Sequence, residues 1–141
     1  MKEKFLIIID EEKKIYNEIY SLNLTLLNKV KSFEFEEFKK DVLKKDKLIN
    51  ELQNFDKELM NLWRNWEEYK ELFSENEKNN IRELKSLMEK NFEIENIIIF
   101  EFEKLMEKEK TKNKHIQKGK AAFNAYKTKK VSFPYFVNEK G

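Results

Sequence analysis

The chain has no glycine and no proline between Met1 and Lys118, and this absence constrains its fold more than any other feature. Glycine supplies the positive φ angles of tight turns, and proline stops helices because it cannot continue the intrahelical hydrogen bonds. A chain that lacks both residues over most of its length has few ways to turn sharply. The sequence therefore predicts a few very long helices, followed by a different C-terminal segment that contains Gly119, Pro134 and Gly141.

The composition supports this prediction and bounds the function. The chain has 141 residues, of which 40% are charged and 40% hydrophobic, a mixture typical of long or coiled helices in a single domain. The net charge of +2 is too small to indicate a polyanionic partner by itself, and the lack of cysteine fits a reducing cytoplasm. The apolar runs at 5–9 and 97–100 are far shorter than the ~20 residues of a membrane span, so we expect a soluble cytoplasmic protein without one.

Apolar residues recur at steps of three and four in three segments, which indicates three long amphipathic helices. We expect these helices at about Lys2 to Lys31, Glu34 to Phe73 and Ser74 to Glu109. The predicted fold is all-α: an elongated antiparallel bundle of three long helices over residues 1–110. Residues 111–141 form a basic C-terminal segment, with a short helix around Gly119 and an aromatic tail, which is part of the same domain or an appendage to it.

Each apolar stripe is interrupted by one polar residue, and two serines suggest where helices begin. Glu12 interrupts the first stripe, Lys45 the second and Asn91 the third. A polar residue at such a position often fixes the register of a bundle at a cost in stability. Ser74 and Glu77 have the spacing of a capping box, so the third helix should begin there. Ser32 is a candidate cap for the second helix.

Residues that would support catalysis are scarce. His115 is the only histidine, and the residue three positions before it is Lys112, which excludes the Glu-x-x-His pattern of metal-binding bundles. No glycine-rich phosphate loop exists. We therefore expect no enzyme activity, no cofactor and no metal site.

A nucleic-acid-binding role is a weaker alternative. Lysines and aromatic residues are frequent between Lys104 and the C-terminus, and aromatic rings can stack on bases. Arginine, the usual residue for bidentate recognition of phosphates and bases, occurs only at Arg64 and Arg82. The scarcity of arginine therefore argues against a nucleic-acid partner.

Three stretches resemble flagellar type III export chaperones of the FlgN and FliT kind. They are the GKAAFNAYK sequence at 119–127, the KDKLINEL sequence at 45–52 and the aromatic ending PYFVNEKG at 134–141. The resemblance implies a cytoplasmic chaperone or adaptor without catalysis. Such a chaperone binds the C-terminal helices of hook-associated or filament-cap proteins, prevents their premature assembly and delivers them to the export apparatus.

The candidate partner-binding surface follows from the third helix. Four consecutive apolar residues, 97–100, lie about 100° apart around a helix, so one core cannot bury them all. We expect Ile97 and Phe100, together with Phe123 and Tyr126, to receive an amphipathic helix of the client. Tyr135 and Phe136 of the tail are expected to occupy the same groove until the client binds.

Two other interpretations remain open. The apolar stripes could pair with a second copy of the chain in a structural coiled-coil homo-oligomer, for which a homodimer is the simplest form. The basic segment could instead bind nucleic acid, as above. The sequence does not distinguish a FlgN-like from a FliT-like client, nor whether the tail folds back on the bundle.

Overall fold

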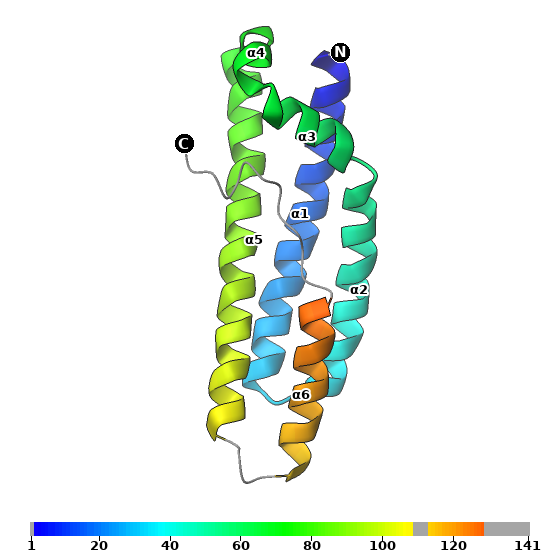
Figure 1. Cartoon of the computed structure of the whole chain (residues 1–141), viewed down its shortest axis with the longest axis vertical. Coiled ribbons are helices and arrows are strands. Elements are labelled where there is room, and N and C mark those ends of the chain that lie inside the picture. The colour runs from blue at the N-terminus through cyan, green and yellow to red at the C-terminus, as the bar shows by residue number, and fades with distance from the viewer. Residues whose placement is uncertain (1, 109–112, 129–141) are drawn as a thin grey trace.

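The computed structural model shows an all-α protein (Figure 1) and describes residues 2–108 and 113–128, with side chains of the second range from Lys118 to Lys127. Within these ranges helices are joined by short turns and no strand occurs, and none of the helices has the length and apolar character of a membrane span. The elements are α1 (Lys2–Lys31), α2 (Phe35–Gln53), α3 (Asp56–Arg64), α4 (Trp66–Tyr69), the 3-10 turn η1 (Lys70–Leu72), α5 (Glu75–Lys108) and α6 (Asn113–Thr128).

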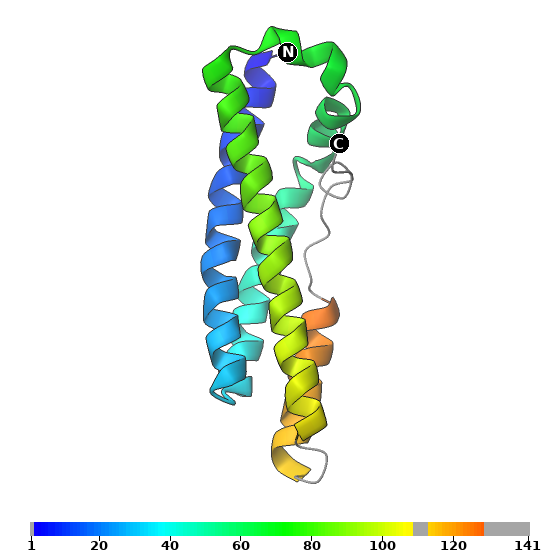
Figure 2. The ribbon, with the colours of Figure 1, turned by 90° about the vertical axis from the view of Figure 1, so that its left-hand side faces the viewer.

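The two longest helices, α1 and α5, run side by side in the same direction along the molecule (Figures 1 and 2). An ion pair between Lys2 Nζ and Glu77 Oε1, at 2.9 Å, joins their first turns. The α2 and α6 helices run in the opposite direction, and α6 packs against both α2 and α5. In the half of the molecule that contains α6, the helices α1, α2, α6 and α5 therefore form a four-helix bundle. In this bundle α2 and α5 occupy opposite corners.

The second expected helix is not continuous, so the prediction of one helix from Glu34 to Phe73 is wrong. The α2 helix ends at Gln53, and the following turn is tightened by hydrogen bonds from Asn54 N–H to Glu51 O (3.2 Å) and from Phe55 N–H to Leu52 O (2.9 Å). The chain then crosses the end of the bundle through α3, α4 and η1 (Figure 1). This crossing is needed because α2 and α5 lie at opposite corners, which a straight rod could not connect.

The helix boundaries near residues 32 and 74 were predicted correctly, but only one cap has the expected form. Ser74 N–H donates to Glu77 Oε1 (2.7 Å), and Glu77 N–H donates to Ser74 Oγ (3.2 Å), which confirms the capping box. Ser32 does not cap α2, because Glu34 precedes that helix and no side chain bonds its first turn.

The first boundary instead uses a C-terminal motif of α1. Phe33 N–H bonds Val30 O (3.2 Å) and Glu34 N–H bonds Lys29 O (2.9 Å), which is the Schellman pattern. Phe33 occupies the left-handed position with φ of 60°. Glycine usually fills this position, so the lack of glycine in this part of the chain places a strained phenylalanine there.

The core consists of two apolar clusters that follow each other along the bundle. One lies toward the α3 end and is built mainly from α1, α3 and α5. The other lies toward the opposite end and includes Phe38, Phe102, Ala122 and Tyr126. Helix α6 thus contributes buried side chains to the second cluster.

Gly119 lets α6 approach its neighbours closely. A Cβ atom added to Gly119 would lie 2.7 Å from Met106 Cε and 3.4 Å from Phe35 Cζ. The glycine inside this helix therefore serves packing rather than a turn.

Candidate functional site

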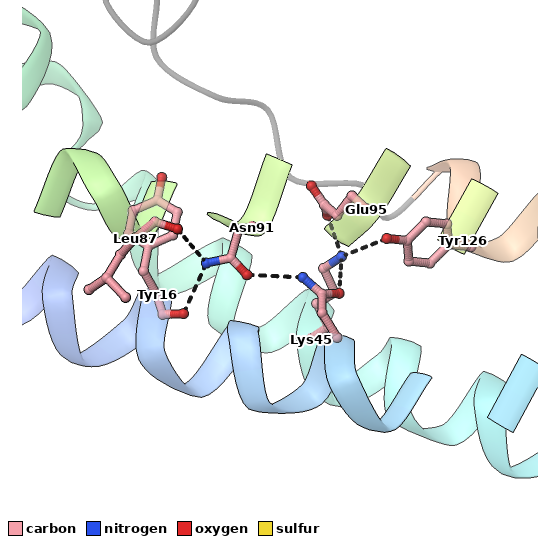
Figure 3. Close-up of polar contacts among 7 residues, drawn as sticks. Tyr16, Lys45, Leu87, Asn91, Glu95 and Tyr126 are labelled. Carbon is pink, nitrogen blue, oxygen red and sulfur yellow. Dashed lines mark hydrogen bonds and ion pairs between the residues drawn. The ribbon is translucent and has the colours of Figure 1, made fainter. Parts of the chain in front are cut away.

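A buried polar layer lies between the two apolar clusters, near the C-terminal end of α6, and fixes how the four helices sit against each other (Figure 3). Its centre is the ammonium group of Lys45 on α2, which has no solvent exposure. Lys45 Nζ donates to Asn23 Oδ1 of α1 (2.9 Å), to Tyr126 OH of α6 (3.4 Å) and to the carboxylate of Glu95 on α5. A lysine ammonium has three donors, so all three are used, and each of the other helices supplies one partner.

Asn91 extends this layer along the contact between α1 and α5. Asn23 Nδ2 donates to Asn91 Oδ1 (3.0 Å), and Asn91 Nδ2 donates to the backbone oxygens of Tyr16 (3.1 Å) and Leu87 (3.0 Å). These bonds form only in one relative position of the two helices. The polar interruptions seen in the sequence at Lys45 and Asn91 are therefore both buried members of one network.

The chemistry of this layer is structural. Burial, reinforced by the charge of Glu95, raises the pKa of the Tyr126 hydroxyl well above its ordinary value, and burial likewise raises the pKa of Tyr16. Both tyrosines therefore stay neutral at physiological pH. Among the residues that the structure describes, no group of three or more His, Cys, Asp and Glu side chains could hold a metal ion.

Glu12 is a second buried polar residue, placed within the apolar cluster at the α3 end. Its side chain is 1% exposed, and neither carboxyl oxygen has a hydrogen-bond partner among the described residues. Burial, followed by the nearby charge of Asp56, raises its pKa from 4.5 to about 8. The carboxyl group is therefore largely protonated at neutral pH.

The residues expected to bind a partner do not form one surface. Ile97 and Phe100 are 47% and 58% exposed, as an interaction surface requires. Tyr126 is completely buried, so its assignment to the binding surface is wrong: the side chain is needed to satisfy Lys45. The Phe123 ring is partly buried and stacks on the Phe102 ring of α5, with centroids 5.1 Å apart. Phe102 is five residues after Ile97, which places it about 140° around α5 from Ile97. The remaining two tail residues, Tyr135 and Phe136, lie outside the described residues.

Ile97 instead belongs to a groove on the outer side of the α1–α5 pair. Its α5 wall carries residues spaced by whole turns, and so does its α1 wall. At one end of the groove the walls meet where Lys90 Nζ lies 5.8 Å from the centroid of the Tyr20 ring. At the other end both helices line one cavity of about 210 Å³. Helical spacing places Leu24 and Leu27 on the same side of α1 as Tyr20 and Lys31, and Ile97 on the same side of α5 as Lys90, Glu101 and Lys104; we call the strip between these two sides the outer groove.

Large apolar side chains are exposed along and beside this groove. Leu24 on α1 is 44% exposed, and Phe33, in the turn after α1, is 43% exposed. Phe100, one turn from Ile97, lies beneath Lys104 Nζ, which is 5.3 Å from the ring centroid. Neither Leu24 nor Phe33 was predicted from the sequence to be exposed here. Leu24 could have been found as an apolar residue outside the buried stripe, whereas the exposure of Phe33 depends on the turn.

Comparisons of this chain with protein-family models, curated proteins and solved structures find no match.

Proposed function

We propose that this protein is a non-catalytic binding protein that holds an amphipathic helix of a partner in the outer groove between α1 and α5. One observation carries the proposal: Ile97 and Phe100 expose about half of their surface on the solvent side of a helix whose opposite side is fully packed. Isolated apolar residues on a surface need no explanation, but a contiguous apolar strip marks an interaction site.

The shape of the groove favours a helix as the bound element. Its two walls belong to parallel helices, and a third helix laid over such a pair buries its own apolar side chains between them. From Tyr20 to Lys31 the groove spans twelve residues of α1, or eleven steps of 1.5 Å, which is about 17 Å. This length matches about three turns of a partner helix.

The resemblance to flagellar export chaperones suggests which proteins carry that helix. Under this proposal the clients are late flagellar substrates, either hook-associated proteins or the filament cap protein. The chaperone covers their C-terminal helices in the cytoplasm, prevents premature assembly and brings them to the export apparatus. Covering an apolar helix until delivery requires only a surface like this groove and no catalytic group.

The experiment measures binding of purified client segments by titration calorimetry. The probes are the C-terminal helical segments of the hook-associated proteins and of the filament cap protein from the same genome. The variant Ile97→Ser/Phe100→Ser should abolish binding while the melting temperature stays nearly unchanged, because both side chains are half exposed. The matched control is Leu43→Ser on α2, where the leucine is 60% exposed but lies away from the groove.

Four results would contradict the proposal. Equal binding by the Ser variant and the parent would show that the client binds elsewhere. Unfolding of the Ser variant would show that the strip belongs to the core. A dimer that is seen at micromolar concentration in sedimentation velocity, and that this variant dissociates, would favour the homo-oligomer. Salt-dependent binding of nucleic acid would favour the nucleic-acid-binding interpretation.

A further inference from the structure

The end of the groove nearest the C-termini of α1 and α5 combines an apolar cavity with an excess of positive charge. Both α1 and α5 end there, and the turn after α1 closes one side. Val30, Phe33 and Leu105 supply the apolar lining of the cavity, which measures about 210 Å³. The charged side chains around it are Lys31, Lys104, Lys108 and Glu101.

The positive charge is only partly compensated. Glu101 Oε1 lies 3.6 Å from Lys104 Nζ, so this carboxylate pairs with one lysine of its own helix. Lys31 and Lys108 have no ion-pair partner among the described residues. The C-terminal ends of α1 and α5 each contribute roughly half a negative charge, which together offset about one lysine. The cavity mouth therefore remains positive.

We infer that the groove takes its partner helix in one direction, with an apolar side chain of the helix's last turn in this cavity and its terminal carboxylate or last acidic residues against Lys31 and Lys108. The inference rests on the proposed function and adds the orientation. A helix C-terminus carries partial negative charge and a free carboxylate, so it complements the lysines. A helix N-terminus placed there would bring positive charge toward them.

The orientation predicts where the rest of the partner lies. Its helix runs parallel to α1 and α5, and its apolar stripe covers Leu27, Leu24 and Ile97 before it reaches Tyr20. Acidic residues toward its C-terminus and apolar residues at spacings of three and four are the chemistry that such a partner needs.

Charge reversal tests the electrostatic part. The probe is a synthetic peptide of the filament cap protein's C-terminal helix from the same genome, made with a free or an amidated C-terminus. Lys31→Glu/Lys108→Glu should weaken binding of the free-acid peptide about tenfold at low salt, and the loss should shrink as salt screens the charges. Lys47→Glu/Lys57→Glu, an equal charge change on exposed positions of α2 and α3, should leave affinity within about twofold.

Crosslinking tests the direction. The chain has no cysteine, so a single introduced cysteine reports one position. Lys108→Cys should form a disulfide with a peptide that carries a C-terminal cysteine and not with one that carries an N-terminal cysteine. Asn17→Cys, on α1 beyond the Tyr20 end of the groove, should show the opposite preference.

The outcomes separate this inference from the proposed function. A peptide that binds at Ile97 but crosslinks with the reversed preference, or that ignores both charge reversal and amidation, overturns the orientation alone. A peptide that does not bind at all overturns the proposed function and the orientation together. Disulfide-linked pairs of the Lys108→Cys chain, formed without peptide and competing with it, would show that a second copy fills the groove and would overturn the inference.

Discussion

Replacing Lys45 by methionine should destabilise the fold strongly, whereas removing Lys45 and Glu95 together should cost much less. In the parent, the Lys45 ammonium and the Glu95 carboxylate are both completely buried and paired with each other. Methionine fills a similar volume without charge, so Lys45→Met leaves the Glu95 carboxylate in the core without its cation. Glu95→Leu leaves the ammonium in the same condition.

The magnitudes follow from the burial. Breaking one side of a buried pair costs about 3–5 kcal/mol, which is a large part of a total stability of about 5–15 kcal/mol. Replacing both partners by apolar residues is neutral or stabilising by about 1–4 kcal/mol in other buried pairs. Here Asn23 and Tyr126 lose their donor as well, at about 1–3 kcal/mol for an unsatisfied group. We therefore expect the double variant within about 2 kcal/mol of the parent.

The assay is urea unfolding of the parent, both single variants and the double variant, followed by far-UV circular dichroism. Fluorescence of Trp63 and Trp66 provides a second probe of whether unfolding is two-state. The double-mutant cycle should give a coupling of at least about 4 kcal/mol. Additive single effects, or a loss below about 1 kcal/mol for Lys45→Met, would refute the burial of this ion pair.

Three further predictions concern single positions, each measured by urea unfolding. Because the Glu12 carboxyl has a folded pKa of about 8 against an ordinary 4.5, the unfolded chain releases that proton first, so stability should fall from about pH 5 to pH 8 by on the order of 5 kcal/mol. Glu12→Gln should abolish this fall and should be more stable than the parent at pH 8. If stability fell with pH as steeply in this variant as in the parent, the raised pKa of Glu12 would be refuted. Phe33→Gly should be about 0.5–1 kcal/mol more stable than Phe33→Ala, because both variants lose the ring but only glycine accepts the left-handed backbone without strain. Equal stability of the two variants would mean that the turn carries no strain. Gly119→Ala should be tolerated because the Met106 methyl can move aside, whereas Gly119→Leu should cost about 1–3 kcal/mol, and a neutral leucine would disprove the close approach of α6.

The long helices were predictable because their signals are local. The absence of glycine and proline, the apolar spacing and the Ser74 capping box each act within a few residues of where they are read. The breaks in the second helix were not predictable in this way. Asn54 and Asn65 are compatible with a helix interior, and the chain bends there because it must reach the opposite corner of the bundle.

The polar layer was half predictable. The interruptions at Lys45 and Asn91 could be found by counting along a stripe, but their partners depend on which helices meet. Glu95 follows the stripe residue Ile94 directly and looks like one more surface glutamate in a chain that is 40% charged. Tyr126 was predicted to join Phe123 on the partner-binding surface, but its side chain is buried. The pair Ala122 and Tyr126, four residues apart, was the available sign of a buried helix face.

The parallel arrangement of α1 and α5 has a consequence for how the chain folds during synthesis. The contacts that join these helices, such as Asn23 with Asn91, link residues 68 positions apart, so α1 cannot complete its packing until α5 has been made. Helices α1 and α2 can pair as soon as Gln53 has emerged, yet α5 ends only at Lys108. At a synthesis rate of about 5–20 residues per second, the apolar face of the α1–α2 hairpin stays uncovered for roughly 3–11 seconds until α5 has emerged. Such a nascent chain exposes apolar surface during that interval, so aggregation or chaperone capture should be greatest for ribosome-bound chains whose last emerged residue lies between Gln53 and Lys108.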